Sequence, residues 1–201
     1  MNNGKFLIYG EKELNYLKSR DQKLGLAIDK IGMIKREVRT DNFEALIMSI
    51  VSQQISRKAA DSIWNRLVDK FSTISASAFA SADLNELHNC GISMRKAGYI
   101  KEISEAVTSG AIDFEKFYSM NDDEIIDKLS SLPGVGVWTA EMFLIFSMCR
   151  MDVVSWGDLA IRRGMMKLYG LKELTQEQFE KYRKSYSPYG SIASLYIWAL
   201  S

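Results

Sequence analysis

The sequence predicts an all-α protein. Apolar residues recur at helical spacing from about residue 40 to the end of the chain, and polar capping residues precede several of these stripes. The 201 residues include only 2 prolines and 13 glycines, and 47% of them are hydrophobic. This is enough for a sizeable core in one domain, or in two lobes built on shared helices. Only residues 1–20, with the stretches KFLIYG and LNYL, suggest extended structure.

The predicted helices of the first half begin at capping residues. Asp41, with Glu44 three residues later, resembles a capping box and is followed by apolar residues at helical spacing. The polar segment 52–54 interrupts this stripe, and Ser56 caps a second helix that continues to about Leu67. Two further helices are predicted to end at Gly91 and Gly110.

The second half is predicted to hold five more helices. Asn121 and Glu124 open a helix that stops at the Leu132-Pro133-Gly134 stretch, and a new helix starts near Val137 and continues to about Cys149. The chain then shows helical patterns over residues 159–169, closed by Gly170, over 176–186 and over 192–200.

Composition excludes several classes of protein and site. Cys90 and Cys149 are the only cysteines, so the chain lacks the thiols for a four-cysteine zinc or iron–sulfur site, and we expect no metal there. We expect separate thiols, with a single disulfide as the alternative. The N-terminus lacks the pattern of a signal peptide, and no stretch reaches the roughly 20 apolar residues of a membrane helix. We therefore expect a cytoplasmic protein, nucleoid-associated in a bacterium, with no membrane partner.

Charge is unevenly distributed although the net charge is only +1. Residues 1–40 carry 9 basic and 5 acidic side chains, residues 41–157 carry 10 and 16, and residues 158–201 carry 7 and 4. The acidic residues between Asp113 and Asp127 are expected to face away from any polyanion. Ordinary solvated helix faces are the alternative explanation.

The sharpest local signal is the string Leu132–Ala140, LPGVGVWTA, between two helices. Gly134 and Gly136 lack the Cβ atoms that would block a close backbone approach. The first N–H groups of the following helix have no intrahelical partner, and the helix dipole adds partial positive charge, so the turn can hold a phosphate. A plain helix–helix turn is the alternative. The residues assigned to DNA binding are Gly134, Val135, Gly136, Thr139 and Ala140.

Four segments, taken together and in their order along the chain, resemble the helix-hairpin-helix DNA glycosylase superfamily. The resemblance is strongest to its 3-methyladenine (alkylbase) branch. The segments are SQQIS at residues 52–56, the hairpin string, Asp152-Val153 with Asp158, and SPYGSIASLYIW at residues 187–198. The resemblance covers about residues 43–198. It implies a two-lobed fold with the active site in the interlobe cleft. Residues 42–157 would form a six-helix lobe that contains the hairpin. The second lobe would be formed by both chain ends, residues 1–41 and 158–201.

The resemblance aligns Asp158 with the catalytic aspartate of the family. From the residues alone, Asp158 precedes a helix and is explained by an N-cap role. The two roles are compatible, because a helix N-terminus favours the ionised form of a carboxylate. An ionised carboxylate near C1′ would stabilise the positive charge that develops on the sugar as the base departs. We interpret Asp152, the nearest competitor, as structural.

The position two residues past the second hairpin glycine is Trp138. Bifunctional relatives carry a lysine there that forms a Schiff base with the sugar. The resemblance therefore implies a monofunctional enzyme without lyase activity.

Base flipping requires a flat-walled pocket and a residue that fills the gap in the duplex. By resemblance, Trp138 and Trp198 match aromatic pocket positions that would stack on cationic alkylated purines. Core packing at helical spacing remains an alternative for Trp198 and Tyr196. The pocket is assigned to Trp138, Trp198, Tyr189, Tyr196 and Met142, and the wedge to Gln54 first, then Ile55, with Gln53 beside them. For the glutamines, hydrogen bonding within the fold is the alternative.

We therefore expect a glycosylase that hydrolyses the N-glycosidic bond of alkylated purines in duplex DNA, acting as a monomer and initiating base excision repair. No cofactor is expected, although hairpin carbonyls could bind Na⁺ or K⁺ as in some relatives. Two alternatives stay open: a glycosylase for another lesion, such as oxidised guanine, and a non-catalytic helix-hairpin-helix module that only binds DNA.

Overall fold

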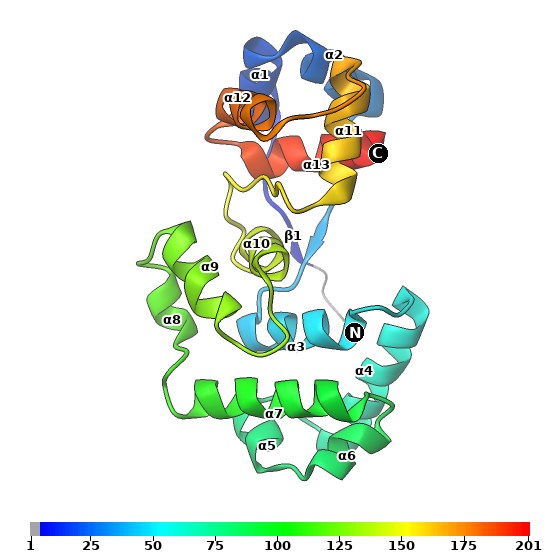
Figure 1. Cartoon of the computed structure of the whole chain (residues 1–201), viewed down its shortest axis with the longest axis vertical. Coiled ribbons are helices and arrows are strands. Elements are labelled where there is room, and N and C mark those ends of the chain that lie inside the picture. The colour runs from blue at the N-terminus through cyan, green and yellow to red at the C-terminus, as the bar shows by residue number, and fades with distance from the viewer. Residues whose placement is uncertain (1–4) are drawn as a thin grey trace. The chain divides into compact units, whose positions relative to one another are not determined.

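A computed structural model describes residues 5–201, and its chain is helical almost throughout (Figure 1). The exception is a pair of two-residue antiparallel strands, in which Lys5 pairs with Val38 and Phe6 with Glu37. The predicted all-α class is therefore confirmed. Within this range, no helix combines the length and apolar character needed to cross a bilayer.

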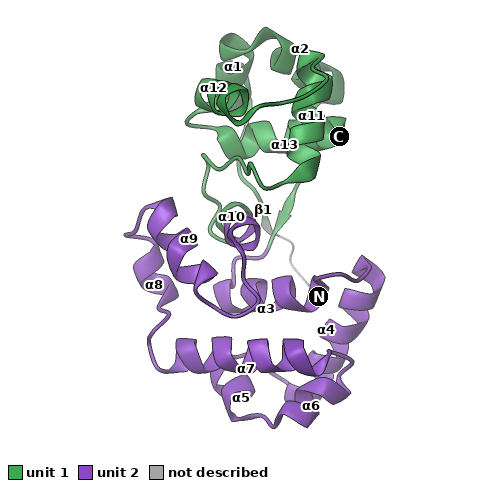
Figure 2. Cartoon of the chain, in the orientation of Figure 1, with its two compact units in different colours: residues 1–38, 144–201 green, residues 39–143 purple. Residues whose placement is uncertain are grey.

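The chain separates into two compact units, residues 1–38 with 144–201, and residues 39–143 (Figure 2). Unit 1 contains β1 (Lys5–Phe6), α1 (Glu11–Arg20), α2 (Gln22–Ile31), β2 (Glu37–Val38), α11 (Leu159–Tyr169), α12 (Gln176–Tyr186) and α13 (Gly190–Leu200). Unit 2 contains α3 (Asn42–Ser52), α4 (Arg57–Phe71), α5 (Ala76–Ser81), α6 (Leu84–Asn89), α7 (Met94–Thr108), α8 (Phe114–Phe117) and α9 (Asp122–Ser130). Helix α10 (Val137–Phe146) begins in unit 2 and ends in unit 1.

Unit 2 is organised around α7, which packs against α3, α5 and α6 (Figure 1). Ala97, Ile100 and Ile103 lie at helical spacing on α7 and are fully buried. Because this face is apolar along its length, it can serve several helices at once. The hairpin and the turn between α3 and α4 both belong to this unit.

Unit 1 is built around α13, whose residues from Gly190 to Ile197 are all buried. Helix α11 packs closely along it, and α2 contacts both. A helix that is apolar on every side belongs in the middle of a core, and α13 takes that place here.

The second unit ends earlier than the predicted boundary at residue 157. The segment after α10 is bound to α13 instead, because Ser191 donates its hydroxyl to the Arg150 carbonyl (2.6 Å) and accepts the Val153 N–H (3.0 Å). Val154 also joins the core of unit 1. These contacts link positions about 40 residues apart, so local sequence patterns do not reveal them.

Four helices were not predicted. Helices α1 and α2 lie in the stretch interpreted as extended or left unassigned, and LNYL is part of α1; only KF forms a strand. Helix α5 is rich in serine and alanine and buries Phe79 alone, and α8 has 4 residues, so neither shows apolar periodicity. Cys90 and Cys149 are separate thiols, as expected.

Candidate active site

Asp158 is the N-cap residue of α11. Its Oδ1 atom accepts hydrogen bonds from the N–H groups of Ala160 (2.8 Å) and Ile161 (3.0 Å). The side chain is therefore held at the positive end of the helix dipole, which stabilises a negative charge. Only 8% of the residue is exposed. The predicted capping role is confirmed, and it gives the carboxylate a fixed orientation.

The loop before Asp158 is anchored by Trp156. Its indole packs edge-on against Phe179 of α12, with ring centroids 5.1 Å apart. The guanidinium of Arg162, one turn into α11, lies 5.0 Å from the Trp156 ring centroid. These contacts restrain the chain on either side of Asp158, so the carboxylate is supported by side-chain packing as well as by its cap.

Trp198 lies near the end of α13 and is half-buried in the same unit as Asp158. Its ring lies against Phe146, with centroids 5.6 Å apart and planes inclined by 34°. The guanidinium of Arg36 also lies over the Phe146 ring, 4.5 Å from its centroid. Trp198 thus belongs to a partly accessible aromatic cluster, as a base-stacking residue requires.

The two tyrosines of the predicted pocket lie in other parts of unit 1. Tyr196 is fully buried in the core of unit 1, and burial raises the pKa of its hydroxyl. Tyr189 precedes α13 and packs edge-to-face on Tyr16, 5.2 Å between centroids. Trp198 follows Tyr189 by nine positions, about 13 Å along the helix axis. Tyr196 is therefore a core residue, and Tyr189 lies at the opposite end of α13 from Trp198.

Asp152 has the structural role expected of it. Its Oδ1 accepts the N–H of Gly190 (3.1 Å) at the start of α13, and its Oδ2 accepts the Ser187 hydroxyl (2.5 Å). A Cβ at position 190 would come within 2.9 Å of Asp152 Oδ1. The glycine in the C-terminal motif is thus needed for this capping contact.

The two hairpin glycines have different reasons to be glycine. Gly134 has φ +78°, and a Cβ there would come 2.4 Å from Cδ2 of Tyr99. Gly136 has no positive φ, and its missing Cβ would project into open space. Gly134 is therefore required by the fold, whereas Gly136 leaves room for something outside the chain to approach the backbone.

The hairpin exposes its backbone and the start of α10. Ala140 donates its N–H to the Gly136 carbonyl (3.0 Å), so the helical bonding of α10 begins at Gly136. Val135, Thr139 and Ala140 are buried. Of the predicted DNA-binding residues, these three can contribute only through the backbone or by packing.

Trp138 follows Gly136 by two residues and is 48% exposed. Met142 lies one helical turn later on the same side of α10 and is half-buried. Both predicted pocket residues in unit 2 are thus partly accessible, and Trp138 offers a large aromatic surface next to the hairpin.

The turn between α3 and α4, residues 53–56, is called the wedge turn here. Its three predicted wedge residues differ in exposure and bonding. The Gln53 side chain is used inside the unit, because its Nε2 donates to the Gly134 carbonyl (2.8 Å). Gln54 is exposed and adopts a left-handed conformation with φ 60°, and Ile55 is 38% exposed. The wedge assignment of Gln53 is therefore wrong, whereas Gln54 and Ile55 lie at the tip of the turn.

Residues 47–188 match the family model of the HhH-GPD superfamily base excision DNA repair proteins. The chain belongs to this superfamily. DNA-3-methyladenine glycosylase 1 of Schizosaccharomyces pombe is 34% identical over 172 residues, which are 81% of this chain and 74% of the relative.

Two solved structures have the same fold as this HhH-GPD protein. The DNA-3-methyladenine glycosidase of Bacillus halodurans superposes with a TM-score of 0.87 at 32% identity, covering 97% of this chain and 91% of that one. The S. pombe 3-methyladenine DNA glycosylase in complex with abasic DNA superposes with a TM-score of 0.77 at 31% identity, covering 93% and 95%.

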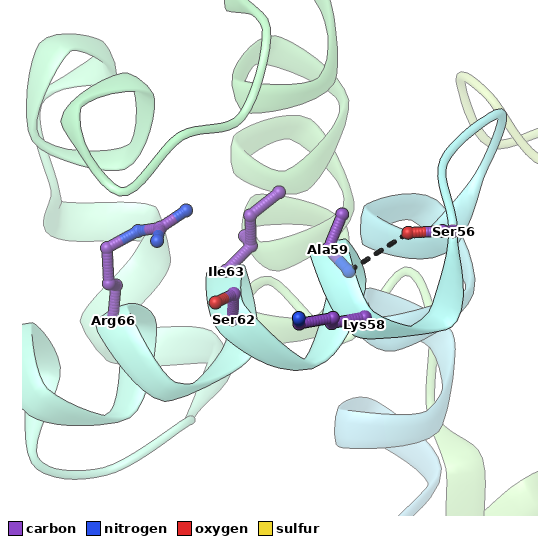
Figure 3. Close-up of a pocket in the computed structure, with 6 residues that line it drawn as sticks. All are labelled: Ser56, Lys58, Ala59, Ser62, Ile63 and Arg66. Carbon is purple, nitrogen blue, oxygen red and sulfur yellow. Dashed lines mark hydrogen bonds between the residues drawn. The ribbon is translucent and has the colours of Figure 1, made fainter.

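One feature of the HhH-GPD protein was not predicted from the sequence. An open hollow of about 400 Å³ lies along α4, from Ser56, the last residue of the wedge turn, to Arg66. Lys58, Ser62 and Arg66 line it at successive helical turns (Figure 3). Their spacing of four residues, one helical turn, is visible in the sequence, but the three side chains are polar and so lie outside the apolar stripe of the helix. Of its two basic residues, Lys58 lies two positions after Ser56, whereas Arg66 donates its Nε to the Cys90 carbonyl (2.7 Å).

The part of this HhH-GPD protein that the structure describes brings few metal-ligating side chains together. Among residues 5–201, His, Cys, Asp and Glu side chains form no cluster of three or more that could hold a metal ion. The monovalent cation suggested for the hairpin would be bound by backbone carbonyls. Of these carbonyls, that of Gly134 already accepts a hydrogen bond from the Gln53 amide, so the ion would depend on the neighbouring hairpin carbonyls.

Proposed function

We propose that this HhH-GPD protein is a monofunctional DNA glycosylase that removes alkylated purines of the 3-methyladenine type from duplex DNA. The observation that carries the proposal is Asp158, fixed by two backbone N–H groups at the start of α11 in a chain of this superfamily. The names of the relatives support the same substrate class, since the matched S. pombe and B. halodurans proteins are called 3-methyladenine glycosylases or glycosidases.

The chemistry assigned to Asp158 is electrostatic. As the bond between C1′ and the purine nitrogen breaks, its electrons leave with the base and the sugar becomes cationic. The ionised carboxylate stabilises this cation and orients a water molecule. The water oxygen bonds to C1′ and its proton is released, leaving an abasic sugar. Because α11 holds the carboxylate, little reorganisation is needed during the reaction.

Hydrolysis without strand cleavage follows from the residue at position 138. Trp138 cannot form a Schiff base with the sugar, so the abasic product is not processed further by this residue. Its exposed indole instead offers an electron-rich face to the purine. A cationic alkylated base binds such a face more strongly than a neutral base does.

DNA binding is assigned to three elements of unit 2. The open backbone at Gly136 and the N-terminus of α10 bind a phosphate. Gln54 and Ile55, at the exposed tip of their turn, fill the gap left by the flipped nucleotide. We expect the protein to act as a cytoplasmic monomer without a cofactor, and any Na⁺ or K⁺ at the hairpin carbonyls would support phosphate binding.

The deciding experiment measures free base released from duplex oligonucleotides that contain 3-methyladenine, 7-methylguanine, ethenoadenine or 8-oxoguanine. We expect release of 3-methyladenine, 7-methylguanine and ethenoadenine, with intact strands until alkali is added. Release of 8-oxoguanine alone would move the substrate to oxidised bases. Absence of release at high enzyme concentration, with salt-dependent binding that shows no lesion preference, would favour a module that only binds DNA.

A further inference from the structure

Helix α7 supports the wedge turn through a lysine. The Lys96 ammonium donates to the carbonyl oxygens of Val51 (2.9 Å) and Gln53 (2.6 Å). These carbonyls close the C-terminal end of α3, where the helix dipole is negative and a cation is favoured. Burial lowers the pKa of Lys96, and the nearby Arg95 adds to the lowering. The ammonium is thus partly withdrawn from water in order to hold this turn.

The same turn is bonded to the hairpin. Gln53 accepts from Lys96 through its backbone carbonyl and donates through its side-chain amide to the carbonyl of Gly134, at 2.8 Å. Gly134 in turn lies against the ring of Tyr99, which follows Lys96 by three residues and so shares its side of α7. One face of α7 therefore holds both the wedge turn and the hairpin.

We propose that Lys96 and Gln53 are positioning residues that lock the wedge turn to the hairpin, so that wedge insertion and phosphate binding act on DNA as one rigid unit. This inference rests on the proposed function. Unstacking a base costs roughly a few kcal/mol. If the turn were flexible, the wedge residues would be displaced instead of entering the duplex.

The conformation of Gln54 supports this inference. Its left-handed φ of 60° is unfavourable for a residue with a side chain and persists only where the surrounding structure fixes it. Gln54 is exposed, so contacts of its own side chain do not provide that restraint. The restraint comes from Gln53, immediately before it, whose backbone and amide are both bonded.

The chain offers a matched control on the same helix. Lys101 also donates its ammonium to two backbone carbonyls, those of Ala80 (2.9 Å) and Ala82 (2.7 Å), at the end of α5. Lys101→Met therefore removes the same type of contact from α7 without touching the wedge turn or the hairpin. Lys96→Arg keeps the positive charge and the N–H donors, and should restore part of what Lys96→Met loses.

The first test is amide hydrogen exchange of the DNA-free protein. Lys96→Met and Gln53→Ala should each raise exchange about tenfold in two separate segments, residues 52–56 and 132–137. Lys101→Met should leave both segments at the wild-type rate. A change confined to residues 52–56, or no change in either segment, would overturn the interlock whatever the protein does to DNA.

The second test is a double-mutant cycle. We expect Gln53→Ala to slow single-turnover base release about tenfold, and to reduce flipping, reported by 2-aminopurine beside the lesion, while binding to undamaged DNA changes less than about twofold. In a protein that already carries Gln54→Ala and Ile55→Ala, Gln53→Ala should have almost no further effect. An equal loss in both backgrounds would contradict the inference. Absence of release by the wild type would refute the proposed function instead, and the exchange experiment would still decide the interlock.

Discussion

Gly164 of α11 lies directly against the backbone carbonyl of Ile197 in α13. A Cβ at position 164 would come 2.1 Å from that oxygen and 2.8 Å from Cγ2 of the same residue. This contact fixes the distance between α11 and α13 where the two helices cross. Asp158 lies six residues before Gly164, about 9 Å along the helix axis, and Trp198 follows Ile197 directly. The packing of one glycine therefore sets the positions of both candidate site residues of unit 1.

Gly164→Ala should destabilise the protein by about 3 kcal/mol or more, because the backbone of α13 cannot move away as a flexible side chain could. Urea unfolding measures the change in the free energy of unfolding. Gly98→Ala, in α7, is the control: its Cβ would meet nothing within 4 Å, so we expect a gain of about 0.5–1 kcal/mol. Equal effects at the two positions would contradict the close packing of α11 on α13.

Asp158→Asn should slow base release by about a hundredfold or more while DNA binding is retained. The amide oxygen of asparagine can still accept from Ala160 and Ile161, so the cap and the fold survive. Single-turnover release and a binding isotherm on the same lesion DNA separate the two effects. Asp152→Asn, which alters a capping contact of α13, should lower the melting temperature but leave release within about threefold. Full activity of Asp158→Asn would refute the assigned mechanism.

Trp138→Ala should weaken the processing of cationic purines more than that of neutral ones. The loss of one cation–π contact, about 0.5–2 kcal/mol, corresponds to roughly 2- to 30-fold in kcat/KM for 7-methylguanine. Ethenoadenine, which is neutral, should be less affected. Trp138 is 48% exposed, so the melting temperature should fall less than in Trp156→Ala, whose indole packs on Phe179. Equal losses on both purines would argue that the indole does not sense charge.

Gly134→Ala and Gly136→Ala should separate folding from DNA binding. At position 134 the positive φ and the Tyr99 ring make any side chain unfavourable, and we expect a loss of about 1–3 kcal/mol in the free energy of unfolding. At position 136 the methyl group enters open space, so stability should stay within about 0.5 kcal/mol while affinity for DNA falls. Fluorescence anisotropy with undamaged duplex DNA checks the second effect. Unchanged affinity in Gly136→Ala would place the phosphate elsewhere.

Alkaline pH should destabilise unit 1 through its buried tyrosines. The Tyr169 hydroxyl donates to Asp21 (2.5 Å) and lies 2.5 Å from the Tyr186 hydroxyl. Burial raises the pKa of Tyr169, and the neighbouring Tyr186 and Asp21 raise it further; burial also raises the pKa of Tyr186. Above the ordinary value of 10.0, the unfolded chain releases these protons while the folded protein keeps them. Stability is therefore fully present below about pH 10 and falls as the pH rises above it.

Tyr169→Phe tests this linkage. The variant should lose about 1–3 kcal/mol at pH 7, because the hydroxyl bonds to a carboxylate. Its stability should then fall less steeply between pH 10 and 11 than that of the wild type, since one proton has been removed from the linkage. Urea unfolding curves at several pH values measure both quantities. Parallel pH profiles for the two proteins would contradict the raised pKa of Tyr169.

Much of the candidate site could be predicted because local patterns determine local structure. The capping position of Asp158, the turn at Gly134 and the helix after Val137 depend on neighbours within a few residues, and all three were predicted. Of the helices that were missed, α5 packs closely against α7 and shows little periodicity of its own.

Sequence alone thus determined the all-α class, the order of the motifs and the residue that caps α11. Only the tertiary structure decided that Gln53 points inward, that Tyr196 belongs to the core and that Gly134, but not Gly136, is required by the fold. Each of these outcomes depends on a partner far along the chain, as Gln53 depends on Gly134, 81 positions away. A repeat of apolar residues reports which side of a helix is buried, whereas the identity of the partner is settled only when distant segments pack together.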